Sequence, residues 1–186
     1  MKTNMDIEKL VESGAILNEL DYERAMVADR KLRLLAKTNA HFKNLRTRLR
    51  NLIEAYEQRV WSNEANVGPE LLRQSDQAET IAEKERVFLA KRKKIIQEKL
   101  KHFNLTQEEL GLLLGHKSKS HMSELINGIK PFTLQDLVII STIFRIDIDA
   151  LVPKYLPIEK IDKISATITA INKPELNKAR LQLFAY

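Results

Sequence analysis

Apolar residues recur at helical spacing through most of the chain, and the clearest run lies between residues 40 and 60. Its members are Phe42, Leu45, Leu49, Leu52, Tyr56 and Val60. Intervals of three and four residues place side chains on one face of an α-helix, and the arginines and glutamates of this segment fall off that face. The stripe suits a helix that faces the core of its own protomer, which we favour, or a short dimeric coiled coil.

A second helix is expected before this one. A weaker apolar stripe of Leu20, Val27 and Leu34 predicts a helix over residues 21–37, and Asn39 can cap the helix that follows. The apolar side of a further short helix, ahead of both, consists of Ile7, Leu10 and Val11. We therefore predict an N-terminal helical hairpin or bundle over residues 1–66.

The clearest break in the chain is Asn66-Val67-Gly68-Pro69, because glycine and proline together favour a turn. The polar residues that follow predict a linker over residues 67–80, itself helical. From residue 81 to residue 103 another helix is expected, with a basic side that carries Lys91-Arg92-Lys93-Lys94. Its apolar residues are Phe88, Leu89, Ile95, Ile96, Leu100 and Phe103.

Residues 104–152 form short segments whose starts and ends are marked. Thr106 and Glu109 have the spacing of a capping box, and Gly115 suits the end of that helix, where a positive φ is favoured. The expected N-caps of the later helices are Ser118 or Ser120, then Thr133, then Asp147. Asn127-Gly128 ends the second helix. The third, over residues 134–144, is apolar on most sides and is expected to be the buried one.

The C-terminal tail, residues 154–186, carries regularly spaced isoleucines, namely Ile158, Ile161, Ile164, Ile168 and Ile171. Their spacing is helical, but the β-branched run over residues 164–171 would also suit a strand, and the sequence leaves this open. Pro174 and Glu175 can open a final helix that ends at Tyr186.

Composition narrows the fold and excludes several kinds of chemistry. The 186 residues include only five glycines and five prolines, which disfavours a turn-rich all-β fold. There is no cysteine, which excludes a disulfide framework, a thiolate nucleophile and any Cys-ligated metal site. No apolar run is long enough to cross a bilayer, and the N-terminus lacks the apolar segment of a signal peptide. We therefore expect an all-α, cytoplasmic protein without a membrane partner.

The charge is unevenly distributed along the chain. The net charge is +6, and residues 81–103 alone hold eight basic and three acidic side chains. A basic surface is what phosphate binding requires, since neutralising phosphates releases their counterions. A solvated helix face produces the same pattern, and the basic run over residues 91–94 fits both interpretations equally.

A short helix, a turn with glycine, a second short helix ending in Asn-Gly, and a buried helix follow one another in order. The residues that carry this order are 105–110, 114–115, 122–125 and 127–130 (LTQEEL, LG, MSEL and NGIK). The pattern resembles the Cro/repressor-type helix-turn-helix of the XRE family. It implies a five-helix, lambda-repressor-like domain over residues 81–153, whose second motif helix enters the major groove of DNA. Gly111 stands where that family favours alanine, and the turn after Gly115 is a residue longer than usual, which leaves the start of the recognition helix open.

Residues 18–25, 52–57 and 115–124 (NELDYERA, LIEAYE and GHKSKSHMSE) resemble segments of HigA-type antitoxins of type II toxin–antitoxin systems. The resemblance implies a homodimer that represses its own operon and neutralises an mRNA-cleaving toxin encoded in the same operon. The N-terminal region, residues 1–66, would then bind the toxin or form the dimer. Two recognition helices about one DNA turn apart would read a palindromic double-stranded operator.

The candidate DNA-binding residues surround the expected recognition helix: Gln107, Lys117, Ser118, Lys119, Ser120, His121, Ser123, Asn127 and Lys130. Lysine can bind guanine or a phosphate, and serine can bind a phosphate or a base. Gln107 is expected to anchor a phosphate and so to fix the register without reading sequence. Glu124 suits DNA only where it accepts from cytosine N4. Its alternative is a pair with Lys130 on the outer face.

Motifs for catalysis, metal or cofactor binding are missing from the sequence. H-E-x-x-H and G-x-S-x-G do not occur, the four histidines form no local ligand cluster, and residues 111–118 fail the spacing of a P-loop. Trp61 would cover a domain core, which we favour, or serve as a hot spot for a partner.

These patterns together predict a sequence-specific DNA-binding repressor that is the antitoxin of a HigBA-like module, with no cofactor, no metal and no enzymatic activity. The alternatives are a stand-alone XRE-family regulator and an interaction protein whose degenerate helix-turn-helix does not bind DNA.

Overall fold

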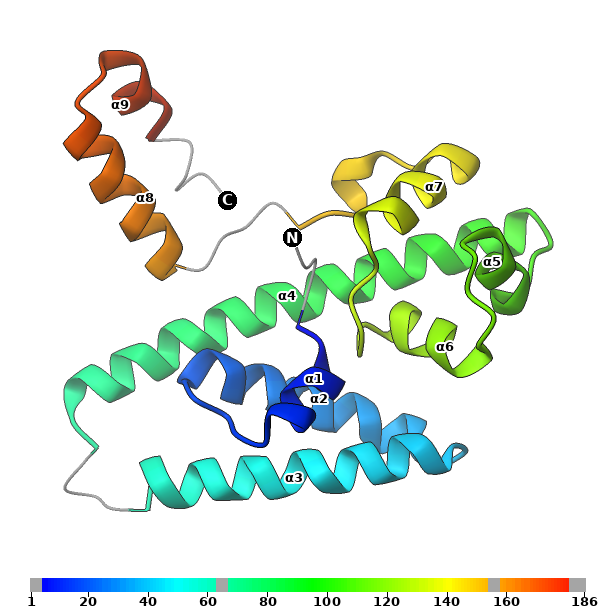
Figure 1. Ribbon diagram of the computed structural model, residues 1–186, viewed down its shortest axis with the longest axis horizontal. Coiled ribbons are helices and arrows are strands. Elements are labelled where there is room, and N and C mark those ends of the chain that lie inside the picture. The colour runs from blue at the N-terminus through cyan, green and yellow to red at the C-terminus, as the bar shows by residue number, and fades with distance from the viewer. Residues whose placement is uncertain (1–4, 63–66, 154–157, 181–186) are drawn as a thin grey trace. The chain divides into compact units, whose positions relative to one another are not determined.

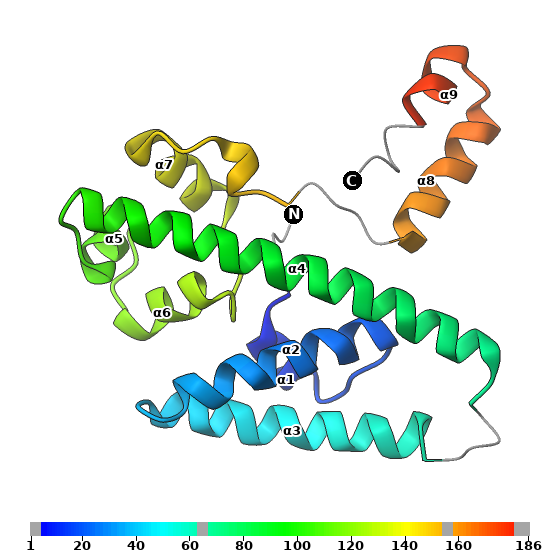
Figure 2. The same cartoon turned by 180° about the vertical axis from the view of Figure 1, so that it is seen from behind.

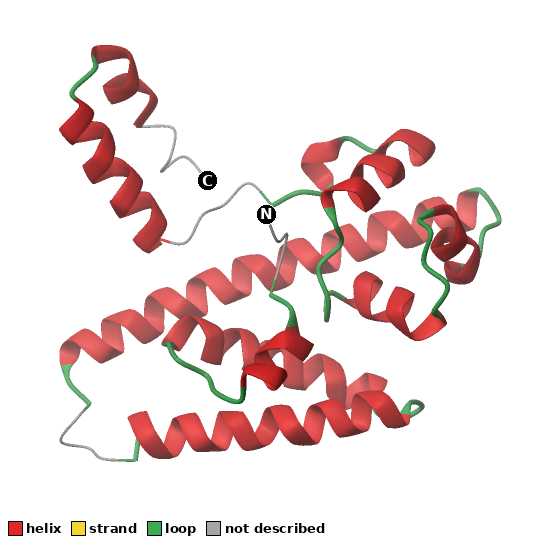
Figure 3. Ribbon diagram, in the orientation of Figure 1, coloured by secondary structure: helices red, strands yellow, loops and turns green. Residues whose placement is uncertain are grey.

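The computed structural model describes residues 5–62, 67–153 and 158–180, and these residues form helices, turns and loops without strands (Figures 1 and 3). The helices are α1 (Ile7–Ser13), α2 (Glu19–Leu35), α3 (Ala40–Val60), α4 (Pro69–His102), α5 (Gln107–Leu113), α6 (Lys119–Asn127), α7 (Leu134–Phe144), the 3₁₀ turn η2 (Ile148–Ala150), α8 (Ile158–Ile171) and α9 (Pro174–Arg180). The all-α prediction is confirmed. The chain divides into two compact units, Met1–Leu151 and Val152–Tyr186.

The N-terminal helices α1, α2 and α3 form the expected hairpin with a short helix before it. Asn39 caps α3 as predicted, its side chain accepting from the amide of His41 at 2.9 Å. Most of the predicted α3 stripe is buried, namely Phe42, Leu45, Leu49 and Tyr56, whereas Leu52 and Val60 are only partly buried. Trp61 packs, half-buried, against this core, in line with the favoured expectation for it.

The predicted apolar face of α2 is wrong. Leu34 is 63% exposed, and the buried positions of α2 include Ala25, Ala28 and Leu32 instead of Leu20, Val27 and Leu34. The reason is that α2 packs against both α3 and α4. Alanines let helix axes approach closely, so small residues occupy much of the contact; Leu32 is buried with them, whereas Leu34 lies outside it.

Helix α4 is one continuous helix of 34 residues, about 50 Å long at 1.5 Å per residue. Gly68 is its N-cap and Pro69 its first residue, a position where the missing amide of proline costs nothing. The structure therefore places no boundary between the predicted linker, residues 67–80, and the predicted helix at 81–103. The N-terminal half of α4 runs along α2, and α5, α6 and α7 gather around its C-terminal half (Figure 2).

The helix-turn-helix part is joined to the N-terminal helices by direct contacts. The amide of Ile7 donates to the carbonyl of Ile129 at 3.0 Å, and Ile129 is fully buried in the N-terminal core. On α4, the Arg92 guanidinium lies between the rings of Phe88 and Phe132, 5.6 and 5.3 Å from their centroids. These contacts explain why residues 1–151 form one unit, whereas the sequence suggested separate regions at 1–66 and 81–153.

The predicted helix starts in the helix-turn-helix part are confirmed. Capping boxes are present at Thr106 with Glu109 and at Thr133 with Asp136, and Asp147 caps η2. The sequence allowed either Ser118 or Ser120 as the N-cap of α6. In the structure Ser118 is the N-cap, and its side chain accepts from the amide of His121. The recognition helix therefore starts at Lys119.

The second unit contains α8 and α9, which contact each other. Residues 164–171 are helical, which settles the alternative between helix and strand. The hydroxyls of Thr167 and Thr169 donate to carbonyls one turn earlier, so these β-branched residues are accommodated within the helix. Pro174 opens α9 as predicted, and the described helix ends at Arg180; the remaining residues, to Tyr186, lie outside the described part. No helix in the described part of the chain is long and apolar enough to cross a membrane.

Candidate nucleic-acid interface

Helices α5 and α6 cross closely because Gly111 has no side chain. A Cβ at this position would lie 2.7 Å from Cγ of Met122 on α6 and 3.1 Å from the carbonyl oxygen of His116. Met122 is itself 1% exposed, so it fills the space that the glycine leaves. The packing of α5 on α6 thus requires a very small residue at position 111. The resemblance to the XRE family, which favours alanine at this position, also indicated a small residue.

The turn between the two helices is fixed by Gly115 and His116. Gly115 has a φ of 80°, a conformation that costs little only for glycine. His116 Nε2 lies 3.1 Å from Asp136 Oδ1 at the start of α7, and its ring meets the ring of His121 edge-on at 4.9 Å. The turn is therefore tied to α6 and α7 and holds the start of the recognition helix in place.

Five of the nine sequence-predicted DNA-binding residues are exposed along the start of α6 and of α5. They are Gln107, Lys117, Ser118, Lys119 and Ser120. Backbone amides at the start of a helix favour anions, and the hydroxyl of Ser118 keeps its hydrogen free to donate while its oxygen caps the helix. This group combines cationic, hydroxyl and amide donors on one exposed surface, and we refer to these five residues as the recognition surface.

An acidic residue lies within this surface. Glu108 on α5 forms an ion pair with Lys119 on α6, and both side chains are largely exposed. The carboxylate raises the pKa of Lys119 above its ordinary value, mainly through their hydrogen bond. Both residues line a cavity of about 160 Å³ between the two helices. Glu108 was not among the predicted residues, because it lies two residues after the N-cap Thr106 and no local pattern indicates a partner on the next helix.

Three further candidates make contacts within the protein. His121 is half-buried, with Nδ1 3.5 Å from Glu124 Oε2. Asn127 donates to the carbonyl of Ser123 at 2.8 Å and accepts from Lys93 Nζ at 2.8 Å. The last contact ties the end of α6 to α4. The polar groups of Ser123 and Asn127 therefore help to hold α6 against α4.

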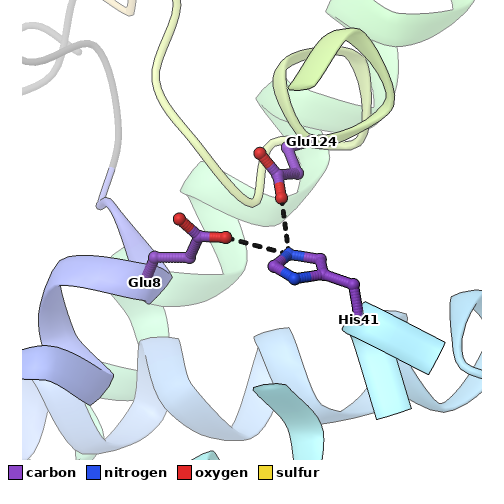
Figure 4. Close-up of side chains that lie close together, drawn as sticks. All are labelled: Glu8, His41 and Glu124. Carbon is purple, nitrogen blue, oxygen red and sulfur yellow. Dashed lines mark hydrogen bonds and ion pairs between the residues drawn. The ribbon is translucent and has the colours of Figure 1, made fainter. Parts of the chain in front are cut away.

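The ninth candidate, Lys130, faces the N-terminal helices. Its ammonium pairs with Glu8 on α1 and with Glu124 Oε2 at 3.0 Å, and Glu124 also lies 2.7 Å from His41 Nε2 (Figure 4). Burial raises the pKa of Glu124, but the hydrogen bonds with Lys130, Glu8 and His41 and the positive charge of Lys130 together outweigh burial and hold that pKa below its ordinary value. The predicted pairing of Glu124 with Lys130 is present, but Glu124 is 3% exposed and does not lie on an outer face.

The basic run on α4 has divided roles. Arg92 is buried, and its guanidinium also donates to the carbonyl of Leu151 at 3.3 Å. Lys93 contacts Asn127, while Lys91 and Lys94 are exposed. The run is thus neither a uniform phosphate-binding strip nor a uniformly solvated face.

Comparison with known proteins supports the assignment of residues 96–151 as a helix-turn-helix domain. Residues 96–151, well under half of the chain, match a family described as Helix-turn-helix. They extend from the last part of α4 through η2 and include the whole recognition surface. The match indicates a DNA-binding transcription regulator of the XRE type, and this family is not an enzymatic one. No curated protein and no solved structure matches the chain.

Proposed function

We propose that this chain is a sequence-specific transcriptional repressor that inserts α6 into the major groove of double-stranded DNA. The observation that carries the proposal is the recognition surface, where polar and cationic side chains are exposed at the start of α6 within a matched helix-turn-helix. In helix-turn-helix proteins the N-terminal residues of the second helix meet the base edges.

The proposed contacts divide into two kinds. Lys117 and Ser118 precede the first turn of α6 and are assigned to phosphates, together with Gln107 at the start of α5. Lys119 and Ser120 lie in the first turn of α6 and are assigned to base edges, with lysine suited to the O6 and N7 acceptors of guanine. Phosphate contacts set the register of the protein on DNA, and base contacts provide sequence specificity.

We further propose a homodimer on a palindromic operator. A single recognition helix reads only a few base pairs, and two helices about 34–36 Å apart would read half-sites one DNA turn apart.

The proposed biological role is that of the antitoxin in a HigBA-like module. Two of the segments that carry this resemblance, residues 18–25 and 52–57, pack together in the structure. The hydroxyl of Tyr22 donates to Glu57 at 2.7 Å, that of Tyr56 donates to Glu19 at 2.7 Å, and the two rings stack with centroids 5.0 Å apart. This reciprocal pair joins α2 to α3 and supports a shared N-terminal architecture. Under the proposal, that architecture binds the toxin.

DNA binding is tested by fluorescence anisotropy with labelled DNA from upstream of the gene, across a salt series, with a scrambled duplex as the control. The proposal predicts a preference of at least about a thousandfold for the upstream DNA. Equal, weak and steeply salt-dependent binding to both duplexes would mean that the net positive charge alone causes the binding. This result would contradict the proposal.

The antitoxin role is tested separately. Expression of a short basic reading frame next to the gene is expected to arrest growth, and co-expression of this full chain is expected to restore it. If the product of the neighbouring reading frame is not toxic, or if co-expression of this chain does not relieve its toxicity, the antitoxin role is contradicted. The protein would then be a stand-alone regulator.

A further inference from the structure

Three side chains that are suitable metal ligands converge where the N-terminal helices meet α6 (Figure 4). They are Glu8 on α1, His41 on α3 and Glu124 on α6. His41 Nε2 lies 2.9 Å from Glu8 Oε1 and 2.7 Å from Glu124 Oε1. The three potential ligand atoms all lie within 4.8 Å of one another.

A single imidazole nitrogen facing two carboxylate oxygens is an unusual arrangement for hydrogen bonds alone. The nitrogen carries either one hydrogen or one lone pair, so it can make one linear hydrogen bond and not two. A cation placed among the three atoms would be bound by all of them at once. In a tetrahedral site with bonds of about 2.0–2.2 Å, ligand atoms lie about 3.3–3.6 Å apart, so His41 Nε2 and each carboxylate oxygen would need to separate by about 0.4–0.9 Å.

Lys130 orients the two carboxylates from the other side. Its ammonium contacts Oε2 of both Glu8 and Glu124, which leaves Oε1 of each directed at His41. Partners of this kind fix ligand orientation in metal sites. The two carboxylates also carry one more negative charge than the ammonium neutralises, which favours a further cation.

The cluster is reachable from solvent. The side chain of His41 is 47% exposed, and it lines a cavity of about 190 Å³ together with Glu8 and Glu12. Glu12 lies one helical turn after Glu8 on α1 and adds a third carboxylate to the wall of this cavity. A cation entering here would find one position open to water or to Glu12.

We propose that Glu8, His41 and Glu124 form a binding site for one divalent transition-metal ion, Zn²⁺ being the ion whose ligand preference fits best. One imidazole and two carboxylates match the nitrogen and oxygen ligands that zinc accepts, whereas calcium and magnesium prefer oxygen alone. The bound ion would link α1, α3 and α6, and so hold the recognition helix to the N-terminal helices. The sequence predicted no metal because residues 8, 41 and 124 lie far apart along the chain and form no local motif.

The site is tested by isothermal titration of Zn²⁺ into the full-length chain after treatment with a chelator, and by the visible absorption of Co²⁺ in its place. One ion per chain is expected, with affinity reduced at least about tenfold by His41→Ala and by Glu8→Gln. The matched controls are His102→Ala and Glu98→Gln, which change exposed residues at the far end of α4 and are expected to bind as the parent does.

His41 and Glu8 are not core residues, so both variants are expected to remain folded in the presence of chelator, which thermal unfolding checks. Absence of saturable Zn²⁺ binding, or equal affinity in the parent and in His41→Ala, would overturn the proposal. The cluster would then be an ion-pair network held by Lys130. Neither result bears on DNA binding, which is measured separately.

Discussion

Glu108 on α5 and Lys119 on α6 form an ion pair across the recognition surface, so the first lysine of the recognition helix already has an acidic partner. Their side chains are 56% and 83% exposed, and water and salt screen the attraction between exposed charges of this kind. A phosphate or a guanine can therefore replace Glu108 as the partner of Lys119. The carboxylate remains close by, and it weakens binding to a polyanion.

Replacing Glu108 by glutamine is accordingly expected to strengthen DNA binding. The change removes a negative charge near the phosphates and releases Lys119, which should raise affinity roughly three- to tenfold at low salt. Fluorescence anisotropy on upstream and scrambled DNA measures this directly. Glu83→Gln, which breaks a similar exposed pair with Arg86 on α4, is the matched control and should have little effect. Unchanged or weaker binding of Glu108→Gln would show that α5 and α6 do not face DNA as proposed.

Gly111→Ala is expected to destabilise the protein despite the higher helix propensity of alanine. The gain in propensity is about 1 kcal/mol, whereas overpacking in a core costs about 1–3 kcal/mol. The new Cβ would lie 2.7 Å from Cγ of the buried Met122, and the carbonyl of His116 limits movement on the other side. Urea unfolding should show a net loss of about 1 kcal/mol, and a net gain would mean that α5 and α6 are less closely packed than described.

Tyr56→Phe is expected to lower the free energy of unfolding by about 1–3 kcal/mol. Glu19 is 6% exposed, and the hydroxyl of Tyr56 is the donor to its Oε1, so the substitution leaves a buried acceptor without that partner. A double-mutant cycle with Glu19→Gln measures the coupling of the two side chains. Additive effects of the two substitutions would contradict a direct interaction between them.

Lys31 makes the free energy of unfolding depend on pH. Burial lowers the pKa of Lys31 to about 8, and the positive charges of Arg92 and Lys93 act in the same direction. The unfolded chain, with an ordinary pKa of 10.5, therefore binds more protons between these values, so the free energy of unfolding rises with pH from about 8 to 10.5. Below this window the folded state carries the full cost of the buried charge.

Lys31→Met should therefore increase stability at neutral pH, by about 1–3 kcal/mol, and flatten the pH dependence above 8. Urea unfolding on both sides of the window measures both effects, with Lys84→Met, at an exposed position on α4, as the control. If the free energy of unfolding depends on pH in Lys31→Met as it does in the parent, the Lys31 amine stays charged in the folded state between pH 8 and 10.5.

Local signals in the sequence were sufficient for several helix starts and ends. Thr106 with Glu109, and Thr133 with Asp136, interact within one turn, so the residues that determine each cap are adjacent in the sequence. Gly115 and Gly128 both adopt the positive φ expected at a helix end. The recognition surface could be located for the same reason, since it follows directly from the caps.

Long-range packing could not be predicted in this way. Leu34 belongs to an apolar stripe but is exposed, because the close contacts of α2 with α3 and α4 select small residues such as Ala28. The polar composition of residues 70–79 indicated a helical linker, and these mostly exposed residues are continuous with the helix that was expected to start at residue 81. Lys130 was expected at DNA or in a pair with nearby Glu124, but its other partner, Glu8 on α1, lies far away in the sequence.

The most direct test of the central claim is DNA binding by the double variant Lys117→Ala, Lys119→Ala. Its control is Arg73→Ala, Lys84→Ala, which removes the same charge from the N-terminal half of α4. The proposed interface predicts that the lysine variant loses at least about tenfold in affinity for upstream DNA, with a salt slope smaller by about 1 because Lys117 no longer neutralises a phosphate, while the control retains its preference. Equal losses in both variants, or none in either, would contradict recognition of DNA through the start of α6.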